Sequence, residues 1–287
     1  MGYWTESDIP SLRGRTAVVT GTGGLGFEAA LALARAGATV ILAGRNARKG
    51  EEAVARMVGA RFELLDLASL RSVVEFAERL QGQRLDLLVN NAAVMTPPRR
   101  GVTEDGFELQ LGTNYLGHYA LTARLLPMLQ GGRVVTLSSV AARRGRLNFE
   151  DLQSERRYDP MAAYGQSKLA CLMFALELER RGLGVTSVAA HPGISRTELL
   201  YNGAGPRSLA GLIRRYLWFL FQPAAQGALP TLYAATVGKD GGYYGPDRFF
   251  EVRGYPAPAR IPAAALDLEA SRRLWEVSQE LTGVRWG

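Results

Sequence analysis

The chain has 287 residues, of which 47% are hydrophobic and 21% are charged, a globular composition rather than a disordered or collagen-like one. Its single cysteine, Cys171, excludes an intrachain disulfide and favours a reducing compartment, so we expect a cytoplasmic protein. The net charge of +7 comes with no zinc-finger, RNA-recognition or basic-zipper pattern, and acidic residues lie among the arginines, so we expect no nucleic-acid partner.

Short apolar runs alternate with longer helical segments along the chain. Runs of β-type composition lie at residues 16–20, 40–43, 62–65, 85–89, 133–137 and 185–190. Helical stretches are expected at 29–36, 47–58, 69–80, 104–129 and 161–182. This alternation predicts an α/β fold, a doubly wound parallel sheet of the Rossmann type in three α/β/α layers. No repeat or linker divides the chain, so we expect a single domain over residues 1–287, with ligands at the carboxyl ends of the strands.

No segment of the sequence predicts a membrane span. The first 15 residues contain no long apolar run, which argues against a signal peptide or an N-terminal anchor. The most apolar short run, residues 216–221, is far shorter than the roughly 20 residues that a spanning helix needs.

The first predicted strand ends in a glycine-rich turn that leads into a helix. Gly21, Gly23 and Gly26 fit the pattern G-x-G-x-x-G of dinucleotide sites. The first glycine permits a tight turn, the second lets a pyrophosphate approach the backbone, and the third lets the helix pack on the strand. Free amides at the helix N-terminus suit the phosphates. The strand–turn–helix context favours this interpretation over a merely glycine-rich turn.

The end of the second predicted strand indicates which dinucleotide is bound. An NAD site usually places a carboxylate about 20 residues after the glycines, where it binds the ribose 2′-hydroxyl. Here Arg45 occupies that place, and Arg48 and Lys49 follow it. Guanidinium groups suit a 2′-phosphate, so the sequence predicts NADP(H) in preference to NAD(H).

A tyrosine and a lysine lie one helical turn apart at the start of the helix expected over 161–182. Tyr164 and Lys168 therefore share one face of that helix. A nearby ammonium stabilises a phenolate, so the pair suits proton exchange with an alcohol or a carbonyl oxygen. Ser138 and Ser139 follow the strand at 133–137, where a hydroxyl can bond to the substrate oxygen. Asn114 is a polar residue in an otherwise apolar helical segment, which suggests a specific hydrogen-bonding role.

Taken together, these motifs resemble the short-chain dehydrogenase/reductase family over nearly the whole chain. The resemblance is carried by the turn at 20–26, Asp66–Leu67, Asn90–Asn91–Ala92, Asn114, Ser138–Ser139, Tyr164-x-x-x-Lys168 and His191–Pro192–Gly193. Residues 43–46, 113–118, 149–155 and 167–170 resemble the retinol-dehydrogenase-like branch, as does the 25-residue separation of Ser139 and Tyr164. The turn is one residue shorter than the family's usual one, and Ala93 replaces a usual glycine, so the pyrophosphate contacts are expected to differ in detail.

The resemblance implies a role for each matching residue. Tyr164 would be the general acid/base, Lys168 would assist it and hold the nicotinamide ribose, Ser139 would orient the substrate oxygen, and Asn114 would support a water-linked proton relay. Asp66 would contact the adenine. The full set implied to bind the cofactor is Gly21, Thr22, Gly23, Leu25, Gly26, Arg45, Asn46, Asp66, Leu67, Asn91, Ala92, Ala93, Tyr164, Lys168, Pro192, Gly193, Ile194 and Thr197.

The function that follows is NADP-dependent hydride transfer between nicotinamide and an alcohol or carbonyl group of a lipophilic small molecule. The alternative is a catalytically silent dinucleotide sensor or regulatory protein, which would have no need of the full catalytic set. We expect a substrate lid at about 195–222; its apolar part, 199–221, also suits an oligomer contact or a membrane-surface helix. The family resemblance implies a homo-oligomer, either a dimer or a tetramer. The two histidines and one cysteine lie apart in the sequence, so we expect no metal site.

Overall fold

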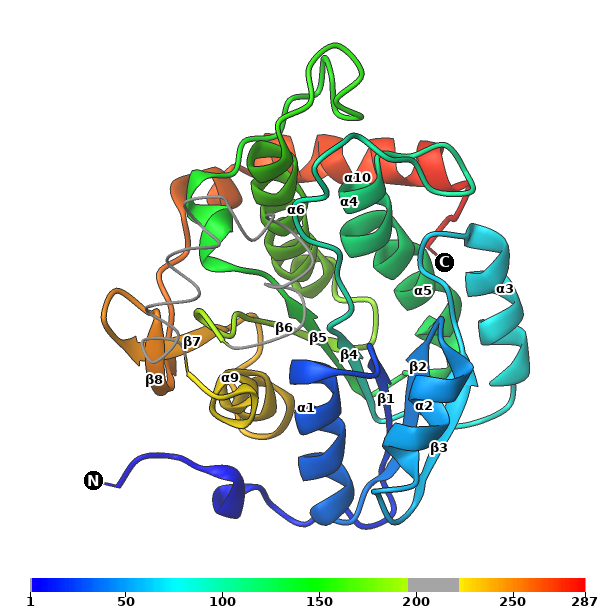
Figure 1. Cartoon of the computed structure of the whole chain (residues 1–287), viewed down its shortest axis with the longest axis vertical. Coiled ribbons are helices and arrows are strands. Elements are labelled where there is room, and N and C mark those ends of the chain that lie inside the picture. The colour runs from blue at the N-terminus through cyan, green and yellow to red at the C-terminus, as the bar shows by residue number, and fades with distance from the viewer. Residues whose placement is uncertain (1, 196–221, 287) are drawn as a thin grey trace.

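A computed structural model describes residues 2–195 and 222–286 of the chain. Within these ranges the strands form one eight-stranded sheet in the order β3-β2-β1-β4-β5-β6-β7-β8 (Figure 1). The strands are β1 (Thr16–Thr20), β2 (Thr39–Gly44), β3 (Ala60–Leu64), β4 (Leu87–Asn90), β5 (Arg133–Leu137), β6 (Thr186–Ala190), β7 (Tyr243–Arg248) and β8 (Arg253–Pro258). All neighbours pair in parallel except β7 and β8. The predicted doubly wound sheet is confirmed, with an antiparallel strand added at one edge.

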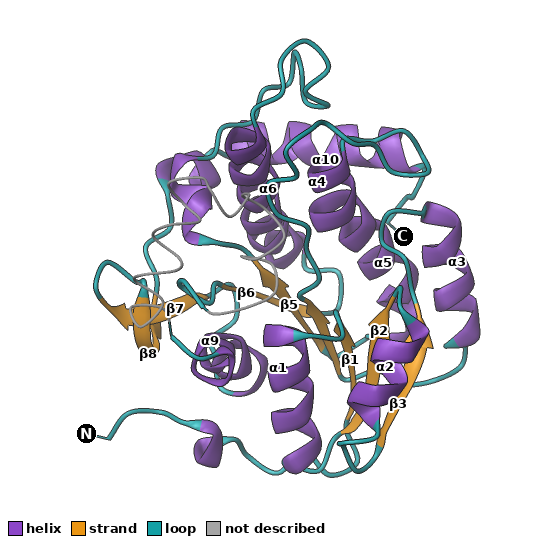
Figure 2. Cartoon of the chain, in the orientation of Figure 1, coloured by secondary structure: helices purple, strands orange, loops and turns teal. Residues whose placement is uncertain are grey.

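Helices cover both faces of this sheet. Figure 2 shows α1 and α9 on one side and α5, α6 and α10 on the other. The helices are α1 (Gly24–Arg35), α2 (Ala47–Val54), α3 (Leu70–Arg79), α4 (Leu109–Leu111), α5 (Gly117–Leu125), α6 (Pro160–Arg181), α9 (Ala224–Thr236) and α10 (Leu268–Thr282). None of the described helices combines the length and the apolar character that crossing a membrane requires.

Each face of the sheet has its own apolar core, because successive strand residues point to opposite sides. Val18 belongs to the core that includes residues of α3, α5, α6 and α10, whereas its neighbour Val19 belongs to the core that includes residues of α1, α2 and α9. Ile41 and Leu42 divide between the two cores in the same way. This double burial explains why the sequences of β1, β2 and β4 are almost continuously apolar rather than alternating.

The helical stretch predicted over 104–129 is shorter and less regular than expected. It contains α4, a π-helical turn over Gly112–Leu116, α5 and a 3₁₀ turn over Leu126–Met128. A π turn adds one residue to the helical repeat, and such turns often lie at functional sites. All five residues of the π turn are buried, so the sequence here offers no contrast between an apolar and a polar face that could have revealed it.

The elements of the C-terminal quarter, α9, β7, β8 and α10, were not predicted from the sequence. Pro230 lies inside α9, and β7 and β8 contain glycines and prolines that normally disfavour helix and strand. The prolines of β8 are tolerated because β8 lies at the edge of the sheet. Tertiary packing overrides local preference in this part of the chain.

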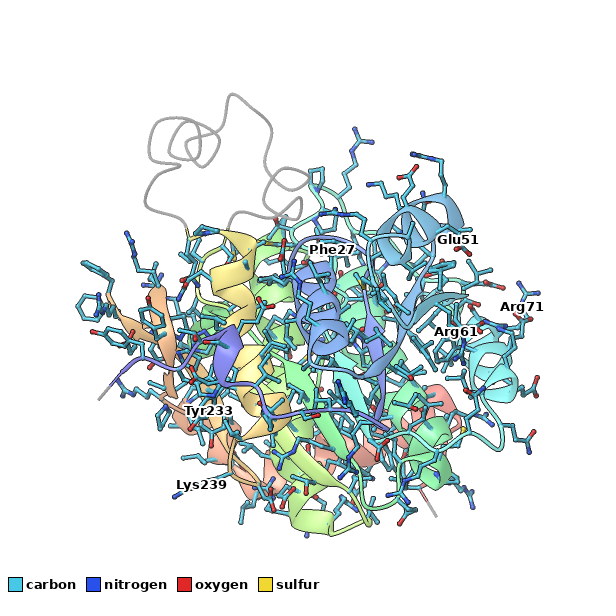
Figure 3. The ribbon with its side chains drawn as sticks, turned by 90° about the horizontal axis from the view of Figure 1, so that it is seen from below. Phe27, Glu51, Arg61, Arg71, Tyr233 and Lys239 are labelled. Carbon is cyan, nitrogen blue, oxygen red and sulfur yellow. The ribbon has the colours of Figure 1, made fainter. Side chains whose placement is uncertain are left out.

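Many of the arginines pair with carboxylates on the surface. Arg71 lies 2.8 Å from Glu104, and Arg15 lies 2.7 Å from Asp86. Figure 3 shows Arg61 and Arg71 on the outside of the molecule, away from Phe27 and Tyr233 on α1 and α9. Much of the high arginine content is therefore balanced locally by acidic neighbours.

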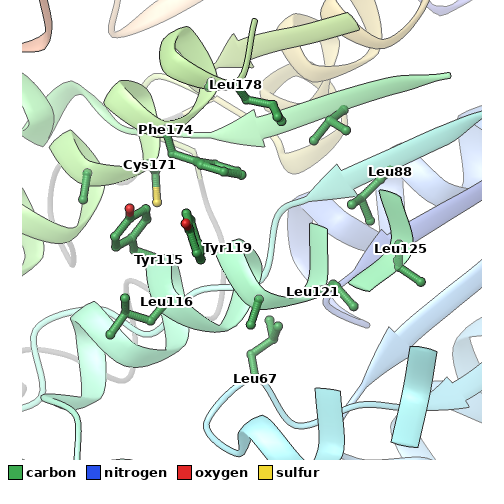
Figure 4. Close-up of a cluster of buried hydrophobic side chains, with 14 of the residues drawn as sticks. Leu67, Leu88, Tyr115, Leu116, Tyr119, Leu121, Leu125, Cys171, Phe174 and Leu178 are labelled. Atoms are coloured by element: carbon green, nitrogen blue, oxygen red, sulfur yellow. The ribbon is translucent and has the colours of Figure 1, made fainter. Parts of the chain in front are cut away.

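A cluster of aromatic rings joins α5, α6 and α10. Figure 4 shows Tyr119 and Phe174 facing each other, with ring centroids 5.6 Å apart. Trp275 of α10 lies 5.2 Å from Tyr119 and 5.9 Å from Phe174. Because Trp275 is only 2% exposed, this cluster holds the C-terminal helix against α6, which carries Tyr164 and Lys168.

Trp275→Ala is expected to lower the free energy of unfolding by about 3–5 kcal/mol, because it leaves a large cavity between three helices. Urea denaturation followed by circular dichroism measures the change. Leu268→Ala is the matched control: Leu268 is on the same helix but 62% exposed, so its loss should cost less than about 0.5 kcal/mol. Equal effects of the two substitutions would contradict the proposed role of the cluster.

Candidate active site

A cleft of about 1080 Å³ opens at the carboxyl ends of β1, β2, β4, β5 and β6. It is large enough for a dinucleotide together with a substrate. Of the residues predicted at the site, those that line it are Gly21, Thr22, Gly23, Leu25, Arg45, Asn46, Asp66, Leu67, Asn91, Ala92, Ala93, Ser139, Tyr164, Lys168, Pro192, Gly193 and Ile194. Gly26 and Asn114 lie behind the lining, and Thr197 and the expected lid segment 199–221 lie outside the described residues.

The glycine turn lies directly against the end of β4. Gly21 has φ of +97°, and a Cβ on it would lie 2.7 Å from Nδ2 of Asn91. A Cβ on Gly26 would lie 2.3 Å from the carbonyl oxygen of Gly21, so only glycine lets α1 approach this closely. Gly24, which the motif left unassigned, has φ of +51° and begins α1. Gly23 faces open space within the described structure, as a phosphate-binding position would require.

The end of β2 presents one arginine to the cleft. Asn46 caps α2, its side chain accepting a hydrogen bond of 3.0 Å from the amide of Lys49. This cap turns the chain so that Arg45 lines the cleft. Arg48 is paired instead with Glu52 at 2.7 Å. Arg45 is exposed and makes no ion pair or hydrogen bond within the part of the chain that the structure describes, so its guanidinium is available to an anion.

Helix α6 brings Tyr164 and Lys168 to the other half of the cleft. Asp159 caps the helix by accepting from the amides of Met161 and Ala162, and Pro160 occupies the first turn. Lys168 is 3% exposed, and its Nζ donates to the carbonyl oxygen of Leu137, 3.0 Å away at the end of β5. A buried ammonium needs such a partner, and this one directs it toward the cleft.

The two serines after β5 have different surroundings. The hydroxyl of Ser138 donates to the carbonyl oxygen of Lys168 in α6 at 2.8 Å, so its proton is not available to a ligand. The hydroxyl of Ser139 accepts from the amide of Ala141 at 3.2 Å, which leaves its own proton available to a ligand. The difference supports Ser139 as the residue that contacts the substrate oxygen.

Close backbone contacts hold the segment after Ser139 against α6. A Cβ on Gly145 would lie 2.3 Å from the carbonyl oxygen of Gly165, and one on Gly165 would lie 3.3 Å from that of Ala141. Gly165 is the residue directly after Tyr164. These glycines therefore bring the tyrosine and the serine segment to the same side of the cleft.

Asn114 lies in the π turn, and its side chain connects two parts of the site. Its Oδ1 accepts from the amide of Val94 at 2.7 Å, and its Nδ2 donates to the carbonyl of Val94 and the hydroxyl of Ser167, each at 3.0 Å. Its main-chain oxygen accepts from Nδ1 of His118 at 2.9 Å and from Sγ of Cys171 at 3.2 Å. The water-linked relay stays a prediction; the structure shows a clamp between the cleft wall and α6.

The loop after β6 is held by a charged group that the sequence did not predict. His191 is buried, its Nδ1 accepts from the amide of Gly193 at 3.2 Å, and its Nε2 donates to Glu251 at 2.8 Å. Glu251 also pairs with Arg143, which follows Ser139 in the 3₁₀ turn Val140–Arg144. The carboxylate therefore joins the loop at Pro192 to the 3₁₀ turn that follows Ser139. No periodicity or motif around Glu251 could have indicated this contact.

One part of the cleft lining, at residues 94–98, 109, 140–144 and 159–162, is mainly apolar. Arg144 and Asp159 are the charged side chains in this part. The apolar members are Val94, Met95, Pro97, Pro98, Leu109, Val140, Ala141, Met161 and Ala162. Within residues 2–195 and 222–286, no three metal-ligating side chains gather.

Comparison with known proteins agrees with this geometry. The family model of the short chain dehydrogenases matches residues 15–204. Retinol dehydrogenase 13 of Mus musculus is 42% identical over 98% of this chain and 86% of its own length. Polyprenol dehydrogenase of Mus musculus is also 42% identical, over 97% of this chain and 87% of its own length.

Solved structures extend the comparison. A crystal structure of an uncharacterized protein from Mycobacterium paratuberculosis has a TM-score of 0.85 and 41% identity, with 100% of each chain covered. A structure described as an NAD(P) dependent gluconate 5-dehydrogenase from Beutenbergia cavernae, with bound NADP, has a TM-score of 0.60 and 27% identity, and covers 79% of this chain and 91% of that one.

The Glu251 contact predicts a specific dependence of stability on pH. Its bonds to His191, to the amide of Arg260 and to Arg143 lower the pKa of Glu251 from 4.5 to about 2, against the opposing effect of burial. The ionised carboxylate therefore stabilises the fold above pH 4.5, and this stabilisation is lost as the pH falls toward 2.

Glu251→Gln should reduce the free energy of unfolding by about 1–2 kcal/mol at pH 7, allowing for the partial exposure of the pair. The difference from the wild type should shrink as the pH falls from about 5 to 3. Urea denaturation across this range measures it. Glu150→Gln, whose side chain is 79% exposed, serves as the control and should show little effect at any pH. A difference for Glu251→Gln that is independent of pH would contradict the assignment.

Proposed function

Because this chain belongs to the short-chain dehydrogenase/reductase family, in its retinol-dehydrogenase-like branch, we propose that it transfers hydride between NADP(H) and a lipophilic alcohol or ketone. Membership of the family makes it an NAD(P)-dependent dehydrogenase that acts on CH–OH groups. The observation that carries the proposal is that Ser139, Tyr164 and Lys168 line the same cleft as the glycine turn. Our proposal adds to this family activity a preference for NADP over NAD and a lipophilic substrate.

The proton chemistry falls to the side chains around Tyr164. When bound, the nicotinamide ring donates or accepts the hydride. In the direction of oxidation, Tyr164 takes the proton of the substrate hydroxyl as the carbonyl forms; in reduction it returns that proton to the oxygen. Ser139 donates a hydrogen bond to the same oxygen, and Lys168 lies one helical turn after Tyr164 on the same face of α6. The contact of Lys168 with Leu137 keeps the ammonium in place without a carboxylate that would neutralise it.

The preference for NADP rests on the end of β2. Arg45 lines the cleft without an ion-pair partner within the described residues, and a guanidinium binds a phosphate through paired hydrogen bonds. The lining residues that the structure describes at this end, Ala43, Gly44, Arg45, Asn46 and Lys49, include no carboxylate for a 2′-hydroxyl. The related structure from Beutenbergia cavernae, described as NAD(P) dependent, has NADP bound at low occupancy.

The lipophilic substrate is inferred from the apolar end of the cleft, next to Tyr164. Apolar walls with a few convergent polar groups bind apolar molecules and orient one reactive oxygen. The names of the relatives, retinol and polyprenol dehydrogenases, describe long-chain apolar alcohols. Both observations favour an alcohol whose hydrocarbon part fills this end of the cleft.

Tyr164→Phe should lower kcat by at least about 10²-fold on any active member of a panel of lipophilic alcohols and ketones, because it removes the proton donor and acceptor. Turnover is measured at the nicotinamide absorbance, and NADPH binding by fluorescence should stay within about twofold, since the aromatic ring is kept. Tyr233→Phe, on α9, is the control and should leave both unchanged. Substantial turnover by Tyr164→Phe would refute the assignment.

Arg45→Asp should shift the ratio of kcat/KM for NADPH over NADH by at least about tenfold toward NADH, since a carboxylate repels the 2′-phosphate and accepts from the 2′-hydroxyl. Steady-state kinetics with both cofactors measure this ratio. Arg48→Asp is the matched control, because Arg48 is paired with Glu52 and is not among the described lining residues. An unchanged ratio in Arg45→Asp would remove Arg45 from the cofactor site.

A further inference from the structure

His118 lies at the centre of a buried set of hydrogen bonds beneath the cleft. It belongs to α5 and is 2% exposed. Its Nδ1 lies 2.9 Å from the main-chain oxygen of Asn114, and its Nε2 lies 2.9 Å from Oγ1 of Thr20 at the end of β1. One imidazole thus bonds both to the strand that begins the glycine turn and to the π turn next to α6.

The partners of the ring determine its protonation state. The carbonyl oxygen of Asn114 can only accept, so Nδ1 carries the proton. Burial, assisted by the positive charge of Lys168, lowers the pKa of His118 to about 4, so the ring is neutral at pH 7. Nε2 then has a lone pair, which accepts from the hydroxyl of Thr20.

Thr20 shows why this acceptor matters. Its Oγ1 accepts from the amides of Asn91 at 2.9 Å and Ala92 at 3.0 Å, and both residues line the cleft. With both lone pairs used, the hydroxyl proton must find an acceptor of its own. The nearer of its two acceptors is Nε2 of His118, at 2.9 Å; the carbonyl of Val89 is 3.3 Å away.

The opposite side of the ring reaches the catalytic helix. The main-chain oxygen of Asn114 accepts from His118, and the Asn114 side chain holds Val94 of the cleft wall and Ser167 of α6. Ser167 in turn bonds to the carbonyl of Tyr164 at 2.9 Å. A continuous series of buried contacts therefore runs from the cleft floor at Asn91 and Ala92, through His118, to the residue proposed to move the proton.

We propose that His118 is a positioning residue for the dehydrogenase reaction: its neutral imidazole, protonated at Nδ1, fixes the cofactor-binding floor through Thr20 and aligns it with α6 through Asn114. The inference rests on the proposed function, because it assigns the floor at Asn91 and Ala92 to the cofactor. His118 is buried and is not among the described residues that line the cleft, so it acts through the two groups to which it is hydrogen-bonded.

Two substitutions, each of which can keep only one of the two hydrogen bonds of His118, test the bonds to Asn114 and Thr20 separately. In His118→Asn the side-chain amide can donate to Asn114 but does not reach Thr20. In His118→Gln the amide oxygen reaches the place of Nε2 and can accept from Thr20. We expect His118→Asn to weaken NADP(H) binding about tenfold, the equivalent of one hydrogen bond, and His118→Gln to bind within about twofold of the wild type. In His118→Asn, the KM for cofactor should change more than kcat.

A double-mutant cycle tests the bond between His118 and Thr20 directly. Thr20→Val should weaken NADP(H) binding at least as much as His118→Asn, because it also removes the acceptor of the Asn91 and Ala92 amides, and the double variant should be no weaker than Thr20→Val alone. Binding is measured by NADPH fluorescence on variants whose thermal unfolding and near-ultraviolet circular dichroism match the wild type. Additive losses, or wild-type affinity in folded His118→Asn, would overturn the proposal. A wild-type protein that binds no NADP(H) would instead refute the proposed function.

The tautomers of the two histidines provide a second, spectroscopic test. His118 should carry its proton on Nδ1, whereas His191, whose Nδ1 accepts from Gly193 and whose Nε2 donates to Glu251, should carry it on Nε2. Nitrogen-15 NMR of the imidazole rings at pH 7 distinguishes the two forms. One signal of each tautomer, with the Nδ1–H signal lost in His118→Gln, is the expected result. Two Nε2–H rings, or a charged His118, would overturn the proposal.

Discussion

The reversal of strand order between β1 and β4 is the constraint on which the site depends. From β1 the chain continues outward through β2 and β3, and then returns to place β4 on the other side of β1. The helix after β1 covers one face of the sheet, and α3, which leads back to β4, covers the other. The connections therefore diverge at the carboxyl ends of β1 and β4 and leave a crevice there, where ligands of such sheets bind. The cleft lies at this place because of topology, before any particular side chain is considered.

Within that crevice, close backbone contacts set the shape. The glycine turn approaches β4 so closely that side chains at Gly21 and Gly26 would collide with Asn91 or with the turn itself. On the far side, Gly145 and Gly165 allow a similar approach beside Tyr164. Protein interiors are densely packed, so a displacement at either contact moves the surfaces that it joins.

Buried polar groups connect the two halves. Lys168, His118 and Asn114 are all withdrawn from water, and each would destabilise the fold without a partner. Each finds its partner on a different element: Lys168 at the end of β5, His118 at the end of β1, and Asn114 at Val94 and α6. Leaving such a buried polar group without a partner raises the free energy of the folded state. The elements are therefore held in the relative positions that keep each of these groups paired.

The regular parts of the fold were predictable because their patterns are local. The strands at 16–20 and 133–137 were predicted with their observed bounds, and the glycine turn and the Tyr164–Lys168 pair were recognised by spacing. The C-terminal elements were missed, since Pro230 and the prolines of β7 and β8 violate local preferences that tertiary contacts override. Gly24 was missed because its need for positive φ depends on the length of the turn, one residue shorter than the usual pattern.

By itself, then, the sequence determined the fold class, the family resemblance and many of the residues that reach the cleft, because periodicity and short motifs are properties of neighbouring residues. Only the tertiary structure decided which groups those residues meet. That Ser138 bonds to α6 while Ser139 keeps its proton, that Glu251 joins Arg143 to His191, and that His118 bonds to Thr20 all depend on contacts between residues far apart in the chain. Such contacts leave no periodic signal, since each is set by the packing of whole elements rather than by local spacing.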